Sequence, residues 1–424
     1  MASPTPAQGI QYGLLGLPLA FVALPLYVLL PNHYARAFGV PLATLGALLL
    51  AARLLDAFTD PLIGRWCDRL FARSLHAVLG WGAAAAVVLA AGFGLLFFPP
   101  TREPLPLLLW AGLMLVLTYA AYSLLSVAHQ SWGAMLGGDE AQRGRIVAWR
   151  EGMGLIGVLL ACIAALALGM AATVALLCAA LALGWLGWSR APRPHAATQA
   201  RAAGLWRPLA EPGFQRLLAV YLLNGIASAI PATLVLFFVQ DRLQTPAALE
   251  PVFLAIYFAC AALSMALWLR IVRRSGLARS WLMGMLLAVA AFVWATRLGE
   301  GDSTACMVVC AMSGVALGSD LALPGAMLAG VIARAGDSGS AEGAYFGWWN
   351  FATKLNLALA AGLSLPLLDQ FGYAPGARDA AALQALSYAY CLLPCALKLA
   401  AAGTLYLLII RPENQRTISC NDAI

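Results

Sequence analysis

The chain has 424 residues, of which 62% are hydrophobic and 11% charged, and its mean hydropathy is +0.81. A soluble domain carries about 25% charged residues, so this composition argues against a soluble protein and indicates a polytopic helical membrane protein. The net charge of +7 does not indicate a nucleic-acid partner. The basic residues lie in short connections between apolar runs, where they set membrane topology.

We predict twelve membrane-spanning helices, each of roughly the 20 residues that a bilayer requires. The first apolar run continues past Leu30 without a preceding basic segment, which indicates a membrane helix rather than a cleaved signal peptide. The fifth and sixth spans are separated only by a weak break near Gly169. The predicted spans are 10–34, 41–64, 76–98, 105–136, 146–168, 170–188, 213–240, 249–271, 279–298, 304–333, 343–369 and 380–410.

A polar connection rich in Arg, Pro and Ala lies near the midpoint, with six predicted spans on each side of it. This pattern is typical of a duplicated six-helix unit. We therefore expect an all-α integral membrane protein with twelve transmembrane helices in two pseudo-symmetric halves. The predicted parts are an N-terminal half (1–188), a central cytoplasmic loop (189–212), a C-terminal half (213–410) and a cytoplasmic tail (411–424).

Arginines are about three times as frequent in the connections on one side of the predicted membrane as on the other. By the positive-inside rule, both termini are expected in the cytoplasm. The expected setting is a bacterial inner membrane, with the lipid bilayer as one partner and a monomer as the functional form.

Three charged residues interrupt the second predicted span. Arg53, Asp56 and Asp60 are three and then four residues apart, so on a helix they share one face. A charge at the bilayer centre costs at least ~2.5–3.5 kcal/mol on insertion scales, so this stripe should face the bundle interior or a water-filled cavity. Two acids and one base leave a local negative charge, which favours a Na⁺ or proton site. A structural ion pair is the alternative.

The segment directly after this span fits the pattern Gly-x-x-x-Asp-Arg-x-x-x-Arg, with Gly64, Asp68, Arg69 and Arg73 at its defined positions. It resembles the signature loop of the major facilitator superfamily, although the usual second glycine is absent. In such a loop, glycine permits close helix packing. The acid can accept hydrogen bonds from a neighbouring helix N-terminus, and the first arginine can pair across the loop.

Two stretches resemble a narrower family, the melibiose permease-like glycoside–pentoside–hexuronide:cation symporters. Residues 55–64 resemble that family's Asp-Ala-x-x-Asp-Pro-x-x-Gly motif, and residues 344–354 resemble its eleventh helix with a buried lysine. The resemblance implies a Na⁺, Li⁺ or H⁺ site formed by Asp56 and Asp60. It further implies that Thr59 and Ser123 are neutral oxygen ligands, and that Lys354 competes for the empty site. Arg53 would keep both acids ionised.

The chain departs from that family where sugar is bound. Ala20 stands where sugar-binding members carry an acid in the first helix, and Ser126 and Gln130 replace a second acid and a tryptophan in the fourth. Acids and aromatic rings are the groups that recognise sugars, so an ordinary disaccharide is not the expected substrate. We expect a small or amphipathic solute instead.

Other polar and aromatic residues within the spans are further candidates for binding the solute. For His129 the alternative is a packing role, and for the adjacent Trp348 and Trp349 it is packing in the core. Arg150 and the adjacent Glu151 could form a gate pair, and the alternative is a local ion pair. Asp320 could pair with Lys354 or meet a cationic group of the solute, while Lys398 could extend to the interface or pair. The full candidate set is Ser126, His129, Gln130, Trp132, Arg150, Asn224, Asp320, Trp348, Trp349 and Asn350.

These features together favour a secondary active transporter, a cation-coupled symporter that works by alternating access. A proton-coupled exporter on the same fold is the alternative, and a membrane scaffold or embedded enzyme is a remote one. The sequence has no catalytic triad, phosphate-binding loop or histidine-rich metal cluster. We therefore predict no enzymatic activity, no cofactor and no metal beyond a coupling Na⁺.

Overall fold

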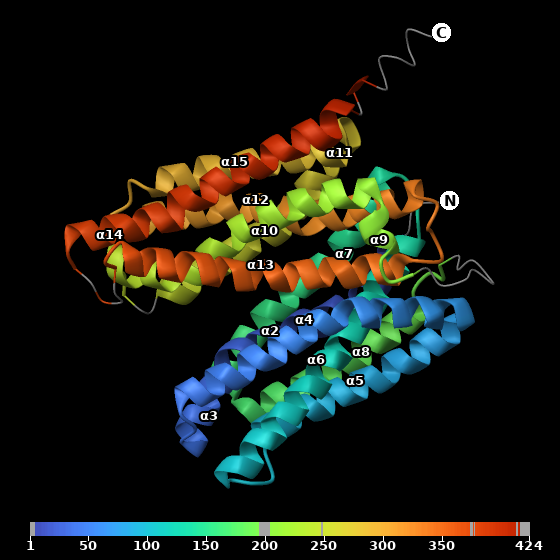
Figure 1. The fold of residues 1–424 in the computed structure, drawn as a ribbon, viewed down its shortest axis with the longest axis horizontal. Coiled ribbons are helices and arrows are strands. Elements are labelled where there is room, and N and C mark those ends of the chain that lie inside the picture. Colours follow the sequence, from blue (N-terminus) through green and yellow to red (C-terminus); the bar gives the residue numbers. More distant parts are fainter. Residues whose placement is uncertain are drawn as a thin grey trace. The chain divides into compact units, whose positions relative to one another are not determined.

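The computed structural model describes residues 5–194, 204–246, 249–373, 376, 378–412 and 414–415, and within these ranges it contains helices and no strand (Figure 1). Contacts divide the chain into two compact units. The first unit comprises Met1–Ala210 and Ala329–Phe351, and the second comprises Glu211–Leu328 and Ala352–Ile424. The predicted parts of the chain stay a prediction, and residues 195–203 of the predicted central loop and 416–424 of the tail lie outside the described residues.

The first membrane pass is broken into pieces, whereas the sequence predicted one continuous span. The pieces are α1 (Pro6–Gly13), α2 (Gly16–Leu24), a π-helical turn (Pro25–Leu29) and α3 (Leu30–Phe38). Pro18 and Pro25 explain the breaks, because a proline has no N–H with which to continue the helical hydrogen-bond ladder.

The rest of the first unit consists mainly of long helices packed against one another. In it α4 and α5 both pack on α6, and α1 and α2 pack on α7. Gly169, with φ 79°, separates α7 from α8 close to the weak break in the sequence. The helices are α4 (Leu42–Arg73), α5 (Leu75–Phe97), α6 (Pro104–Met135), α7 (Glu140–Ile163, with a π-helical turn at Ala164–Leu168), α8 (Met170–Arg190) and the short α9 (Arg207–Ala210).

In the second unit, α15 packs against both α10 and α11. The last residues of α12 and the first residues of α13 group with the first unit instead. The helices are α10 (Pro212–Phe237), α11 (Glu250–Ala295), α12 (Ser303–Arg334), α13 (Glu342–Gln370), α14 (Ala380–Ser387) and α15 (Leu393–Leu405), with π-helical turns at Phe238–Arg242, Tyr388–Leu392 and Tyr406–Ile410.

Nine helices of the described chain are long and apolar enough to cross a membrane. One of them, α11, has 46 residues and covers two predicted spans, and Gly276 interrupts it with φ 77°. The broken first pass and α4, whose charged residues lower its hydropathy, are not among the nine. When α11 counts as two passes and these two are added, the total is the predicted twelve.

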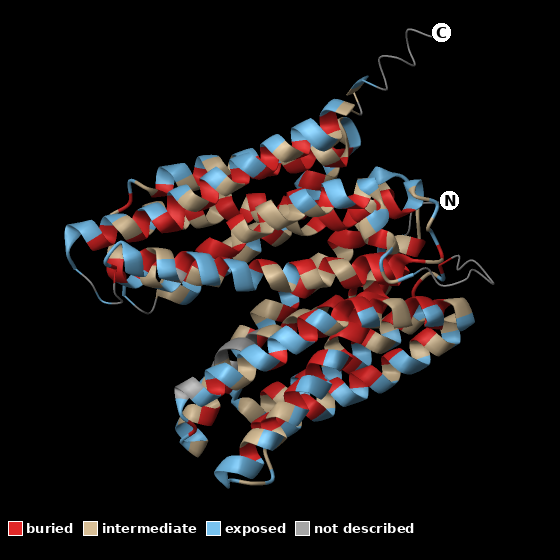
Figure 2. Ribbon diagram, viewed as in Figure 1, coloured by how far each residue is buried: buried red, intermediate tan, exposed pale blue. Residues whose placement is uncertain are grey.

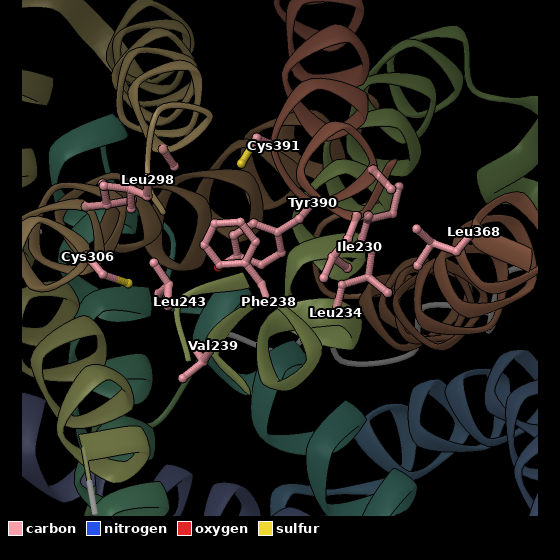
Figure 3. Close-up of a cluster of buried hydrophobic side chains, with 14 of the residues drawn as sticks. Ile230, Leu234, Phe238, Val239, Leu243, Leu298, Cys306, Leu368, Tyr390 and Cys391 are labelled. Atoms are coloured by element: carbon pink, nitrogen blue, oxygen red, sulfur yellow. The ribbon is translucent and has the colours of Figure 1, made fainter. Parts of the chain in front are cut away.

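Buried residues line the helix faces that pack together in each unit, and exposed residues lie on the faces that point outward (Figure 2). Large apolar residues are found in both groups. In the second unit, the rings of Phe238 and Tyr390 stack with centroids 4.2 Å apart inside a cluster that includes Ile230 and Leu234 (Figure 3). On the outside, Leu105 and Leu263 are 66% and 78% exposed. Exposed leucine is normal where the surrounding solvent is lipid, so each unit has the surface of a membrane protein.

Glycines allow α4 and the first turns of α13 to approach closely within the first unit. A Cβ atom on Gly64 would overlap the carbonyl oxygen of Gly343, and one on Gly347 would lie 2.7 Å from the carbonyl oxygen of Asp60. Gly343 and Gly347 are four residues apart, the spacing with which small residues bring membrane helices together. The helix that carries the acidic pair is thus held at this point by backbone-to-backbone contact.

We expect Gly64→Ala to destabilise the protein by about 2 kcal/mol or more, because the added methyl group forces the two backbones apart. Gly46 lies on the same helix, and a Cβ atom there meets nothing within 4 Å. Gly46→Ala is therefore the matched control, and it should be neutral or stabilising by up to about 1 kcal/mol. Thermal unfolding of both purified variants in detergent measures the difference, and equal stability of the two would contradict the packing argument.

Candidate cation and solute sites

The helix α4 presents its two acids to the interior of the first unit. Asp56 is 7% exposed and Asp60 is fully buried, whereas Arg53, one turn before them, is exposed. The spacing of the three residues predicted a shared face. Burial thus differs along this face of the helix, and the role of Arg53 in keeping the acids ionised stays a prediction.

Two hydroxyl groups lie against Asp56. The Ser123 hydroxyl on α6 donates to Oδ1 of Asp56 at 2.9 Å, and the Thr59 hydroxyl donates to the Asp56 backbone carbonyl at 2.9 Å. Each hydroxyl oxygen keeps lone pairs after donating its proton. This part of the first unit therefore brings together carboxylate and hydroxyl oxygens, the donor type that hard cations such as Na⁺ prefer, and the carboxylates could equally hold a proton.

A cavity of about 340 Å³ lies between α4 and α6 in the first unit. Asp56, Thr59 and Tyr119 are among the residues that line it, and most of the other lining residues are apolar, including Leu55 and Trp66. Burial alone would isolate a carboxylate from ions, but this cavity leaves one side of the Asp56 region accessible.

Lys354 lies on the part of α13 that belongs to the second unit and is partly buried. Its approach to the two acids stays a prediction, as do the ligand roles of Thr59 and Ser123.

The residues predicted to form a signature loop lie instead in the last turns of α4, which continues to Arg73. No helix-breaking residue follows Gly64 in this segment, so the helix continues until Ser74, whose side chain caps α5. Asp68 accepts hydrogen bonds from the backbone N–H groups of Gly343 (2.6 Å) and Ala344 (2.9 Å) in the first turn of α13. An acid is favourable there because of the helix dipole. Arg69 and Arg73 are exposed.

Two of the predicted solute residues in the first unit form contacts between segments. His129 is fully buried, its Nε2 lies 2.7 Å from the carbonyl oxygen of Tyr12, and the Tyr12 hydroxyl donates to the His129 carbonyl at 3.0 Å. The indole of Trp132 donates to the carbonyl of Pro192 at 2.9 Å. These contacts favour the packing role for His129, and the solute role of Trp132 stays a prediction.

The remaining candidates of the first unit are dispersed. Gln130 donates to the Ser126 hydroxyl at 2.9 Å, and Arg150 pairs with the adjacent Glu151, with Nε 2.9 Å from Oε1. The Trp348 indole donates to the carbonyl of Leu205 at 2.9 Å. Of the two residues after it, Trp349 is buried and Asn350 is partly buried. Their solute roles stay predictions.

The second unit contains a buried polar network centred on Asp320 of α12. Its Oδ1 accepts from the Trp281 indole at 2.9 Å and from the Asn224 amide at 3.2 Å. Its Oδ2 accepts from Lys398 at 2.7 Å and from the Ser228 hydroxyl at 3.3 Å. Four donors on three other helices thus fill the approximately four acceptor positions of one carboxylate.

Lys398 therefore pairs with Asp320 inside the unit, which decides between the alternatives that the sequence left open for this lysine. Its ammonium group also donates to Ser228 at 2.8 Å. Trp281 and Ser228 were not among the sequence candidates. Ser228 follows Asn224 by four residues and so shares its helix face, a signal that could have identified it; nothing near Trp281 in the sequence indicates its partner.

We expect Asp320→Asn and Lys398→Met each to destabilise the protein by about 3–5 kcal/mol, because each leaves one buried charge without its partner. The double variant should recover most of this loss, since no uncompensated charge remains. Thermal unfolding and yield of membrane-inserted protein measure the effect. A double variant that is as unstable as the sum of the single variants would rule out the charge-pairing account.

Comparison with known proteins gives a match over nearly the whole chain. Residues 9–411 match the model of the family described as MFS/sugar transport protein. YagG of Escherichia coli K12, named as a glycoside/cation symporter, is 28% identical over 152 residues, which are 35% of this chain and 32% of that protein. YicJ of the same organism, named as an inner membrane symporter, is 28% identical over 123 residues, 28% of this chain and 25% of that protein. The matched segments thus span about a third or less of each relative.

Solved structures share the fold at low sequence identity. A bacterial homologue of the iron transporter ferroportin has a TM-score of 0.70 at 18% identity and covers 93% of this chain and 99% of its own. The fucose:proton symporter FucP of E. coli has a TM-score of 0.66 at 15% identity, with 93% of this chain and 98% of FucP covered. The human organic anion transporter MFSD10 has a TM-score of 0.65 at 18% identity, with 95% of this chain and 100% of MFSD10 covered. These likenesses show the twelve-helix major facilitator fold. Together with the family match, they establish that the chain belongs to the MFS/sugar transport protein family of the major facilitator superfamily.

Proposed function

We propose that this protein is a secondary active transporter that couples solute movement to a Na⁺ or H⁺ gradient. The observation that carries the proposal is the contact between Ser123 and Asp56 next to the fully buried Asp60. Two acids inside a membrane helix are costly unless they are paired or used. Here they lie with hydroxyl oxygens beside a cavity, an arrangement suited to reversible binding of a small cation.

Coupling would follow from electrostatics. A cation or proton that binds between Asp56 and Asp60 reduces their mutual repulsion and lowers the cost of burying them. If the solute binds the same conformation, each ligand raises the affinity of the other by the same factor, because the coupling free energy is reciprocal. Lys354 would take the place of the cation when the site is empty.

Several features of the chain support the rest of the proposal. The relatives YagG and YicJ are named as symporters, which favours import together with the ion over the exporter alternative. The missing sugar-binding acids favour a small or amphipathic solute over a disaccharide. The arginine bias favours cytoplasmic termini. The inner membrane named for YicJ favours the same location for this chain. The proposed functional form is a monomer.

We expect Asp60→Asn to abolish gradient-driven accumulation, since a neutral amide cannot compensate a cation. A ligand present at 100 times its Kd stabilises a protein by about 2.7 kcal/mol, so the wild type should unfold at a higher temperature in saturating Na⁺ or at lower pH. The variant should lose that response and still insert into the membrane. Asp369→Asn, which removes one exposed acid, is the charge-matched control. Full ion-dependent stabilisation of Asp60→Asn would exclude this cation site.

A second variant tests the hydroxyl ligand. Ser123→Ala removes one neutral oxygen and the hydrogen bond to Asp56, and it should weaken cation affinity by roughly tenfold, which corresponds to about 1.4 kcal/mol. Maximal uptake at saturating cation should change little, because both acids remain. Titration of Na⁺, and separately of pH, against unfolding temperature gives the affinity. An unchanged half-saturation point would show that Ser123 is not a ligand.

A further inference from the structure

The cavity between α4 and α6 combines one acid with a largely apolar wall. Among the described residues that line it, Asp56 is the only charged one, and Leu55, Leu62 and Val116 belong to the apolar majority. Its volume of about 340 Å³ is at the lower end of the roughly 300–1,000 Å³ that small-molecule sites occupy. Such sites are mostly apolar, with a few polar groups that orient the ligand. The cavity is therefore suited to a small and largely apolar ligand.

The mouth of this cavity lies on the outer face of the first unit. Leu55 and Leu62, which line it, are 48% and 56% exposed, and Ala120 on the opposite wall is also exposed. Asp56, by contrast, is 7% exposed, so its carboxylate lies on the inner side. Exposed leucine in a membrane protein faces lipid. A ligand that partitions into the bilayer can therefore enter the cavity and reach the acid.

Two aromatic side chains in the cavity wall add a preference for organic cations. Trp66 contributes from α4 and Tyr119 from α6. The ring of Trp66 packs edge-on against Trp81 of α5, with centroids 4.7 Å apart, and Tyr119 is only 3% exposed. These contacts hold both rings in place. The face of an aromatic ring attracts ammonium groups, and the attraction is stronger where water is excluded.

The same lining disfavours the other classes of small ligand. Asp56 repels an anion, and a polyhydroxylated molecule would lose hydrogen bonds to water that an apolar wall does not replace. A small inorganic cation can bind the carboxylate, but it gains nothing from the apolar wall. An ammonium group on an alkyl chain matches both parts of the cavity, because its charge pairs with the acid and its chain contacts the apolar wall.

We propose that the cavity between α4 and α6 binds a small lipophilic ammonium ion, with its nitrogen against Asp56 and its alkyl chain along the apolar wall. Binding itself is independent of the proposed transport function. Only its consequence rests on that function, because Asp56 also belongs to the proposed cation site. A bound ammonium ion competes there with Na⁺ or H⁺, and it inhibits coupled transport from the membrane side.

The test measures binding of n-octylamine to the purified full chain in detergent at pH 7, by isothermal titration and by thermal unfolding. Octylamine is protonated at this pH, as a lysine side chain is, and 1-octanol and octanoate are its neutral and anionic counterparts. Octylamine should bind the wild type at least tenfold more tightly than either counterpart. Asp56→Asn should abolish this preference. Asp369→Asn, which removes an exposed acid of the second unit, is the control and should retain it.

A second variant keeps the test decisive if Asp56→Asn does not fold. Ala120→Leu fills part of the cavity and retains Asp56 with its hydrogen bond from Ser123. The position is exposed, so the larger side chain should be tolerated. This variant should weaken octylamine binding by at least tenfold. Ala91→Leu, at an exposed position of α5 that is not among the lining residues, is the matched control and should bind as the wild type does.

Sodium titrations on the same samples separate this site from the proposed function. Octylamine should raise the half-saturating Na⁺ concentration of the wild type, whereas 1-octanol should not. If octylamine binds no more tightly than 1-octanol, or if Asp56→Asn and Ala120→Leu bind it within twofold of the wild type, the ammonium site is wrong while cation coupling stands. If octylamine binding depends on Asp56 but the wild type responds to neither Na⁺ nor pH, the proposed coupling fails and the ammonium site stands.

Discussion

The cost of placing a charge in a hydrocarbon layer governs where this chain carries its acids and bases. Asp320 and Lys398 meet at 2.7 Å within the second unit, with both side chains largely buried. Neither could stay ionised next to lipid without the other. The remaining polar groups of the network follow from this pair, because a buried carboxylate is stable only when its acceptor positions are filled. Helices α10, α11 and α15 contribute the donors and α12 the carboxylate, so the network also ties four helices together.

The two acids of α4 lie in different surroundings from those of Asp320. Asp56 has a hydroxyl partner on α6 and lies beside a cavity, whereas Asp320 is enclosed by donors. A fully satisfied carboxylate gains little from a further cation, but an oxygen-rich and accessible one can bind and release it. The two units thus differ in the chemistry their buried acids permit. We propose reversible ion binding for the acids of the first unit, whereas Asp320 and Lys398 of the second unit form a fixed polar framework with their donors.

Much of the fold could be predicted from the sequence because bilayer thickness sets the length of an apolar helix. The number of passes and the break at Gly169 were predicted in this way. The predictions failed where local backbone chemistry overrode hydropathy. Prolines divide the first pass, and the signature residues after Gly64 continue α4 as helix instead of forming a loop. The break at Gly276, by contrast, lies in the predicted gap between the eighth and ninth spans. Hydropathy averages over a window and does not register one missing N–H.

By itself, the sequence determined that this is a membrane protein of the major facilitator type and that Asp56 and Asp60 share one face of a helix, because composition and the 3.6-residue period are local properties. Only the tertiary structure decided which groups meet across helices. The partners of Asp320 lie 39 to 96 residues away along the chain, and Asp68 reaches the start of α13 across more than 270 residues. No spacing rule connects such positions. Their contacts arise from helix packing.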